Sequence, residues 1–142
     1  MSRVDPVSGT TIRRSVQFYE VDGAGIVHFS WFFRYMEEAE HALWRSAGLS
    51  IAPTTEIAFP RVAATFDFRR PLRFEDEFDV RIHVTSIRTK TMQYRCELLK
   101  SGEVAAVGTM TIACVSVRAG QPMRAVPFPA EIIERFSTAQ QP

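Results

Sequence analysis

The sequence predicts an α+β fold in which a curved five-stranded antiparallel sheet wraps around one long central helix. Apolar residues recur at three- and four-residue steps from Phe29 to Leu43, the period of an amphipathic helix. Later segments alternate apolar and polar residues, the period of half-buried strands. A helix with one apolar stripe and a sheet with one apolar face must bury each other.

The helix is predicted between an N-cap at Ser30 and a stop at Gly48. A serine side chain caps a helix by accepting a hydrogen bond from a free N–H of the first turn. Glycine readily supplies the left-handed residue that follows a last turn. The expected apolar stripe is Phe29, Phe32, Phe33, Met36, Ala39, Ala42 and Leu43.

Strands are predicted on both sides of this helix, and a short helix at 129–137 follows them. Pro60 indicates a strand start or an edge position. The last strand is apolar or small on both faces, so we expect it to be central or covered on both sides. Short turns between the strands after the helix favour near-continuous hairpins. The strands are predicted at 11–19, within 57–70, and at 77–85, 91–99 and 104–117.

Length and charge indicate a single domain with no general affinity for nucleic acid. The chain has 142 residues and a formal net charge of +1. Residues 1–10 are polar and without period, so we expect a flexible leader before one domain at 11–138. No apolar run approaches the roughly 20 residues that span a bilayer.

The cysteines and the first residues favour a cytoplasmic location. Cys96 and Cys114 lie in apolar runs without the spacing of a metal site, which predicts buried thiols in a reducing compartment. The first ten residues lack the apolar core of a signal peptide.

An acidic, glycine-containing break separates the first predicted strand from the helix. Asp22 is followed by Gly23-Ala24-Gly25 and a short apolar run. Glycine allows backbone shapes closed to other residues, and a helix start offers free N–H groups and a partial positive charge. Asp22 is therefore a candidate reactive group; the alternative is an acid that hydrogen-bonds the backbone of its own turn.

The segment around this break has a recognisable pattern, made by Tyr19, Glu20, Asp22, Ala24, Gly25, Ile26, Val27, His28 and, in the helix, Glu37. This pattern resembles that of the hotdog-fold acyl-CoA thioesterases, in the branch of 4-hydroxybenzoyl-CoA thioesterase and the Tol–Pal-associated thioesterases. Two positions depart from it: Gly23, where Pro or Ala is more usual, and Trp31, where Asn is frequent. Further similarity extends over residues 13–136, at 59–60, 70–74, 76–77 and 123–127.

The resemblance implies a hydrolase that splits an acyl-CoA thioester with no metal and no organic cofactor. Asp22 would attack the carbonyl or activate a water molecule. Backbone N–H groups near His28 and Phe29 would hold the developing oxyanion. Trp31 would narrow or reshape the acyl pocket. The other implied substrate contacts are Tyr19, Gly25, Val27, Phe32, Phe33 and Glu37.

Several of these residues have a second interpretation. His28 lines the pocket or, with Ser30 and an acid, forms a triad, although Ser30 is better explained as a cap. Glu37 supports catalysis or is a solvated or subunit-bridging acid. Contacts with the CoA phosphates would come from Arg88, Lys90, Arg61 and Arg124, each of which alone is also explained as a solvated charge.

Other functions on the same fold remain open at this point. A non-catalytic acyl or acyl-CoA binding module would keep the pocket without requiring Asp22. A thioesterase for acyl-carrier-protein substrates differs little in sequence, and a dehydratase would need a later Asp and His pair that is not found. A homodimer or homotetramer with its site at the subunit interface is expected by resemblance, and dimerisation would cover an exposed sheet edge.

Overall fold

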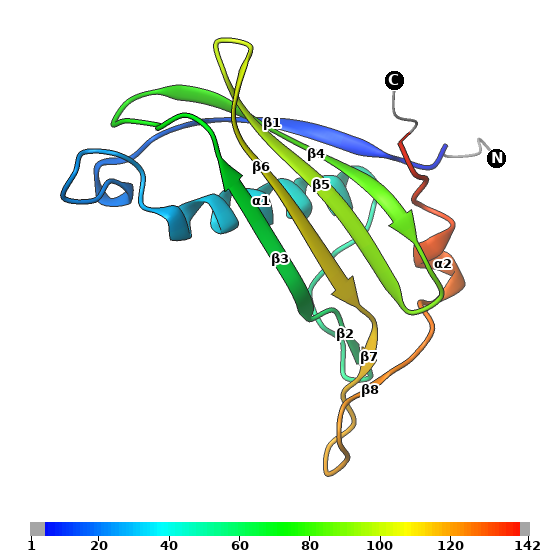
Figure 1. Cartoon of the computed structure of the whole chain (residues 1–142). Helices are drawn as coiled ribbons and strands as arrows, with labels where there is room; N and C mark the ends of the chain where they lie inside the picture. Colours follow the sequence, from blue (N-terminus) through cyan, green and yellow to red (C-terminus); the bar gives the residue numbers. More distant parts are fainter. Residues whose placement is uncertain (1–4, 140–142) are drawn as a thin grey trace.

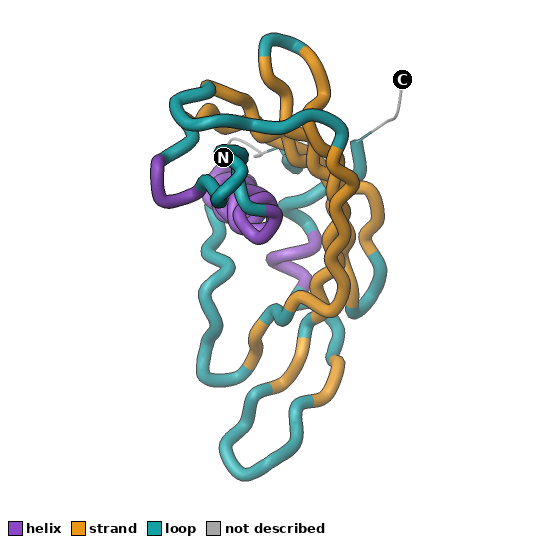
Figure 2. Tube along the Cα trace, turned by 60° about the vertical axis from the view of Figure 1, so that its left-hand side comes forward, coloured by secondary structure: helices purple, strands orange, loops and turns teal. Residues whose placement is uncertain are grey.

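The computed structural model describes residues 5–139 and has one main sheet with a long helix, α1 (Phe29–Ser46), across one face (Figure 1). Its five strands are antiparallel and lie in the order β1-β4-β5-β6-β3. Figure 2 shows that α1 lies on one side of the curved sheet. The predicted fold class is confirmed. The strands are β1 (Gly9–Ser15), β3 (Arg61–Phe68), β4 (Glu77–Ile87), β5 (Thr91–Lys100) and β6 (Glu103–Ala113).

The first strand starts and ends earlier than predicted. β1 begins at Gly9, so the last two residues of the predicted leader belong to the sheet, and residues 1–4 lie outside the described part. β1 ends at Ser15, and Phe18–Glu20 forms a 3₁₀ turn, η1. The turn forms because the Glu20 carboxylate accepts a hydrogen bond from the Gln17 N–H at 2.8 Å.

The connection between β3 and β4 is not the hairpin that the sequence predicted. β3 pairs with β6 at one edge of the sheet, whereas β4 pairs with β1 and β5. Residues 69–76 therefore pass across the end of the sheet, and their backbone contacts the segment before α1. The Val27 N–H donates to Leu72 O at 2.8 Å, and Ile26 forms a bridge with Arg73.

The predicted last strand divides into two strands that belong to different sheets. β6 ends at Ala113, and β7 (Val115–Ser116) pairs with β2 (Ile57–Ala58) and β8 (Arg124–Ala125). The break falls at Cys114, whose N–H donates to Lys90 O. β6 lies between β5 and β3, which confirms its interior position. The C-terminal helix α2 (Ala130–Ile133) is shorter than predicted.

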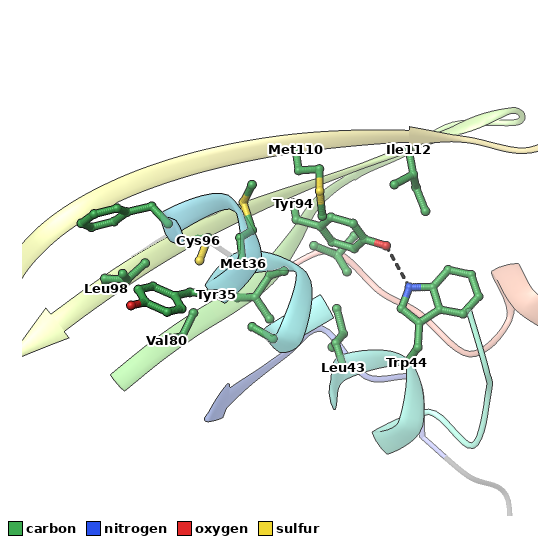
Figure 3. Packing of buried hydrophobic residues seen from close by; sticks show 14 of the residues in the cluster. Tyr35, Met36, Leu43, Trp44, Val80, Tyr94, Cys96, Leu98, Met110 and Ile112 are labelled. Carbon is green, nitrogen blue, oxygen red and sulfur yellow. Dashed lines mark hydrogen bonds between the residues drawn. The ribbon is translucent and has the colours of Figure 1, made fainter. Parts of the chain in front are cut away.

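The core lies between α1 and the inner face of the sheet (Figure 3). Trp44 Nε1 donates to Tyr94 OH at 2.8 Å. The apolar residues that alternate along β4 and β5 are all buried: Phe78, Val80, Ile82, Val84, Met92, Tyr94, Cys96 and Leu98. Phe29 was expected in the stripe but is 60% exposed, because side chains of a first turn tilt beyond the helix start. The buried residues of α1 are Phe32, Tyr35, Met36, Ala39, Glu40, Leu43 and Trp44.

The helix stop was predicted correctly and the cap was not. Gly48 follows the last turn with φ +76°. The N-cap is His28 rather than Ser30, because His28 Nδ1 accepts the Ser30 N–H at 3.3 Å. Ser30 contributes its hydroxyl, which lies 2.8 Å from the same nitrogen. Among residues 5–139, no helix has the length and apolarity needed to cross a membrane.

Both cysteines are expected to resist thiol reagents in the folded protein. Cys96 and Cys114 are buried, and burial raises the pKa of the Cys96 thiol to about 12. Since the thiolate is the reactive form, an aromatic disulfide reagent should label neither cysteine at neutral pH and both after unfolding in guanidinium. Absorbance of the released chromophore measures this, and rapid labelling of the native protein would contradict the buried positions.

Candidate active site

Asp22 lies in a tight loop between η1 and α1. Val21 and Val27 form an antiparallel bridge at the stem of the loop, and the Asp22 N–H donates to Ile26 O at 2.8 Å. Gly25 has φ +81°, a left-handed conformation that favours glycine.

The Asp22 carboxylate has one oxygen committed to the loop and one that is not. Oδ1 accepts the Ala24 N–H at 2.8 Å and is 3.4 Å from Ile26 N. Oδ2 accepts no hydrogen bond from the described residues. The two interpretations of Asp22 are therefore compatible, because a single side chain both stabilises its turn and presents a free oxygen.

An open cavity of about 490 Å³ lies beside this carboxylate. Its walls come from three places: the Asp22 loop, the first turn of α1, and the end of β3 with the crossing connection that follows it. The lining is mainly apolar, with Asp22 and two arginines as its charged groups. The lining residues are Asp22, Ile26, Val27, Phe29, Phe32, Phe68, Arg69, Arg70, Pro71 and Leu72.

Aromatic rings form much of this cavity. Phe32 and Phe68 meet edge to face, with ring centroids 4.9 Å apart, and Phe68 is 50% exposed. Behind them, Phe66 lies against Gly108, where an added Cβ would come within 2.7 Å of the ring. Only glycine leaves room for this ring, so Gly108 sets the position of the aromatic wall.

The backbone donors near the helix start differ in availability. The His28 N–H, expected as an oxyanion donor, already donates to Glu20 O at 2.8 Å. The Phe29 N–H, at the first residue of α1, has no acceptor among the described residues. Phe29 is therefore the free donor next to the cavity, at the positive end of the helix dipole.

His28 does not form a triad. Its ring is exposed, lies against Phe29 with centroids 4.5 Å apart, and is bonded to Ser30. No hydrogen bond joins His28 to Asp22 in the described part of the chain. The side chain acts as the helix cap.

Three aromatic residues expected to contact substrate lie outside the cavity. Tyr19 and Trp31 pack together with centroids 5.5 Å apart, and the Arg34 guanidinium lies 5.2 Å from the Trp31 ring centroid. Phe33 packs against Phe66 at 5.1 Å. Neighbouring residues on a helix point about 100° apart, so Phe32 faces the cavity while Trp31 and Phe33 do not.

Glu37 and Arg61 are engaged with each other, 3.6 Å apart, on the side of α1 that faces β3. Arg61 also binds Glu40, which is fully buried and whose pKa burial raises. Neither Glu37 nor Arg61 lines the Asp22 cavity. Arg61 is therefore not a free cation for a CoA phosphate.

The other basic residues expected at the CoA phosphates lie at the far end of the sheet. β4 extends for 11 residues from Glu77, at about 3.3 Å per residue, before the turn that carries Arg88 and Lys90. Figure 1 shows this turn, between β4 and β5, and strand β8, which contains Arg124, on the opposite side of the molecule from the loop before α1. They cannot reach the cavity of their own chain.

Two arginines that line the cavity, Arg69 and Arg70, were not predicted as site residues. Arg70 binds Glu103 at 3.0 Å, whereas Arg69 has no ion pair among the described residues. Their position depends on the crossing of residues 69–76, which the predicted hairpin excluded. The Arg69-Arg70-Pro71 sequence could have indicated them, because a proline after two arginines favours a bend at which both charged side chains are accessible.

A larger concave region, of about 770 Å³, lies on the outer face of the sheet. It is lined in part by Arg81, His83 and Arg95, and no residue predicted for the site reaches it. Within the described residues, no group of three or more His, Cys, Asp or Glu side chains is placed to hold a metal ion.

Comparison with known proteins assigns the chain to a family. Residues 16–136 match the thioesterase-like superfamily. The chain is 32% identical over 124 residues to a protein of Aquifex aeolicus (strain VF5) named "Putative esterase", covering 86% of this chain and 93% of that protein. It is 27% identical over 113 residues to the 1,4-dihydroxy-2-naphthoyl-CoA hydrolase of Prochlorococcus marinus (strain MIT 9313), covering 72% of this chain and 75% of that protein.

A solved structure of similar sequence gives the same result. A gentisyl-coenzyme A thioesterase superposes with a TM-score of 0.78 and 26% identity, covering 90% of this chain and 100% of that chain. Its similarity agrees with the hotdog architecture expected from the sequence. The names of these relatives are those of esterases, hydrolases and thioesterases, which confirms the predicted enzyme class. The chain belongs to the thioesterase-like superfamily and has its hotdog fold.

Proposed function

We propose that this protein hydrolyses an acyl-CoA thioester to a free acid and CoA, with Asp22 as the catalytic carboxylate. One observation carries the proposal: Asp22, which has one carboxylate oxygen free of hydrogen bonds, and Phe29, which has a free N–H, both line one open apolar cavity. A thioester carbonyl needs a base or nucleophile and an oxyanion donor, and the cavity offers these together.

In this mechanism Asp22 Oδ2 either attacks the thioester carbon or takes a proton from the attacking water. The carbonyl oxygen gains negative charge and accepts the Phe29 N–H, a type of contact worth about 2.7–4 kcal/mol in the transition state. The C–S bond then breaks and the CoA thiolate leaves. Where Asp22 acts as the base, the thiolate takes up the proton that Asp22 removed from water, and the free carboxylic acid departs. If Asp22 attacks, water hydrolyses the resulting anhydride in a second step.

The acyl group is proposed to be aromatic. The Phe29, Phe32 and Phe68 rings border the cavity, and aromatic rings pair favourably in edge-to-face or offset arrangements. The names of two relatives are those of enzymes for aromatic acyl-CoA substrates. Membership of the 4-hydroxybenzoyl-CoA thioesterase branch, with its Asp, Gly and His28 motif, is part of this proposal.

The active form is proposed to be a homodimer or a homotetramer, and the location cytoplasmic. β3 is an edge strand, with Val62 58% and Phe68 50% exposed. Pairing of this edge with a second copy would bury these side chains and satisfy its backbone groups. Arg88 and Lys90 are too far from the cavity of their own chain to bind the phosphates of a CoA bound there. In an oligomer, Arg88 and Lys90 of a second copy would bind these phosphates together with Arg69 of the first chain.

Sedimentation equilibrium tests the assembly. We expect a dimer or tetramer at micromolar concentration, and Val62→Asp should shift it toward monomer because a charge would be placed in the buried edge. Thr11→Asp, on the exposed strand β1, should leave the assembly unchanged. A wild-type monomer with full activity would contradict a site shared between subunits.

The function is tested by thiol release from a panel of benzoyl-, 4-hydroxybenzoyl-, hexanoyl- and palmitoyl-CoA, with a benzoyl-carrier-protein thioester alongside. We expect the aromatic CoA esters to have the highest kcat/KM. Phe68→Ala should reduce that preference by about tenfold, the low end for the loss of a hydrophobic contact. Phe18→Ala removes an exposed ring outside the cavity and should leave the preference unchanged.

Two other results would favour the alternative functions. Binding of acyl-CoA without thiol release would establish a non-catalytic binding module. Preference for the carrier-protein ester would show that the carrier protein, rather than CoA, carries the acyl group.

A further inference from the structure

A buried carboxylate lies directly behind the Asp22 loop, and the mechanism proposed above does not use it. Glu20, the last residue of η1, is fully buried. Its Oε1 accepts the Gln17 N–H and the Tyr35 OH, each at 2.8 Å, and an Arg14 guanidinium N–H at 2.9 Å. Its Oε2 lies 2.7 Å from the same Arg14 nitrogen, an ion-pair contact, and accepts no hydrogen bond from the described residues. Buried charge persists only where partners replace the lost water, so these contacts hold the side chain in one position.

The partners of Glu20 tie the loop to both layers of the fold. Arg14 comes from β1 and also binds Glu38 of α1 at 2.8 Å. Its guanidinium lies 4.6 Å from the centroid of the Tyr35 ring. Tyr35 comes from α1 and packs against Phe78 of β4, with centroids 4.9 Å apart. The Glu20 carboxylate is therefore anchored to the sheet and to the helix at once.

The backbone of Glu20 leads directly into the Asp22 loop. Glu20 O accepts the His28 N–H at 2.8 Å, and this pair is the base of the loop. The next pair is the Val21–Val27 bridge, and beyond it lies the Asp22 N–H to Ile26 O bond. Any shift of the Glu20 main chain would thus move the stem on which Asp22 and the Phe29 N–H are both placed.

We infer that Glu20 is a positioning residue, which fixes the Asp22 carboxylate relative to the Phe29 N–H through the loop stem. The inference rests on the proposed function, since it concerns the same carboxylate. Glu20 itself does not line the cavity, so it acts through Asp22 rather than on substrate. A displacement of about 1 Å in a reacting group lowers rate by about 10²-fold, which sets the effect expected when the anchor is lost.

The chain contains a matched control for a purely structural role. Glu40 is the other fully buried carboxylate: Arg61 binds it, and the Tyr94 hydroxyl, which accepts the Trp44 indole N–H, lies near it. Among the described residues, no hydrogen bond or ion pair joins this second cluster to the Asp22 loop. Tyr35→Phe and Tyr94→Phe therefore each remove one phenolic hydroxyl beside a buried carboxylate, and only the first should affect Asp22.

The test measures kcat and KM for benzoyl-CoA with Glu20→Gln, Tyr35→Phe, Tyr94→Phe and the wild type, after denaturation curves establish that each is folded. Glu20→Gln should lower kcat by about 100-fold and KM by less than threefold, following the cost of a misplaced group. Tyr35→Phe should lower kcat about threefold to tenfold, and Tyr94→Phe should not change it. In an Asp22→Asn background, Glu20→Gln should add no further loss, because the group that it positions is already gone.

Several results would overturn the inference. One is full kcat in folded Glu20→Gln; another is an equal loss from Glu20→Gln with and without Asp22→Asn. If Glu20→Gln does not fold, equal kcat for the two tyrosine variants has the same meaning. If the wild type releases no thiol, the proposed function fails, and amide hydrogen exchange decides the positioning: Tyr35→Phe should speed exchange of the Asp22 and His28 amides, and Tyr94→Phe should not.

Discussion

Asp22→Asn is expected to lower kcat for acyl-CoA hydrolysis by about 10²–10⁴-fold, the usual contribution of a general acid–base group. Asparagine keeps the Oδ1 acceptor for the Ala24 N–H, so the loop should retain its shape. What is lost is the negative charge of a residue that lines the cavity. Steady-state thiol release, with binding of benzoyl-CoA measured by calorimetry, separates lost chemistry from lost binding.

Asp79→Asn is the matched control for this substitution. Asp79 lies on the outer face of the sheet, where it pairs with Arg13 at 3.2 Å, and it does not line the cavity. Exposed ion pairs contribute little, so activity should be unchanged. If Asp22→Asn hydrolyses benzoyl-CoA as well as Asp79→Asn does, another group performs the chemistry.

Trp44→Ala should reduce the free energy of unfolding by about 3–5 kcal/mol, the range for large aromatic side chains removed from a core. Trp44 is fully buried and packs against Phe59 and Phe136, with ring centroids 5.0 and 5.2 Å away. Its loss would also leave the buried Tyr94 OH without the indole N–H, as Figure 3 makes clear. Equilibrium unfolding in urea measures the change.

Trp31→Ala is the comparison for that result. Trp31 lies on the same helix but is only half buried, against Tyr19 and Arg34. Its removal should cost about 1 kcal/mol, the centre of the range for single substitutions, because the ring is only partly buried. Equal losses from the two variants would mean that the packing between helix and sheet is not what stabilises the fold.

Local patterns in the sequence predicted those parts of the fold that depend on local geometry. The stripe along α1 and the alternation along β4 and β5 follow from the helical and strand periods, and Gly48 follows from its backbone freedom. The crossing of residues 69–76 depends on which strands pair at long range, and no local period encodes that. Because this crossing was not predicted, Arg69 was not expected at the site.

The candidate site shows the same division. Asp22 stands out in the sequence because a loop with two glycines precedes a helix, and the structure places it at the cavity. The roles of Trp31 and His28 depended on side-chain direction, which the sequence does not specify. Glu20 was identified only as a residue that matches the family pattern, without a role, because its burial requires Arg14 and Tyr35 from separate elements to meet it.

The most direct test of this account is a crystal structure of Asp22→Asn with 4-hydroxybenzoyl-CoA bound. The acyl ring should lie in the cavity against Phe29, Phe32 and Phe68, with the carbonyl oxygen accepting the Phe29 N–H. The thioester carbon should then lie about 3–3.5 Å from the substituted side chain, the separation of a near-attack geometry. A thioester bound beside Glu37, or in the concave region on the outer face of the sheet, would contradict the assignment of Asp22 as the catalytic group.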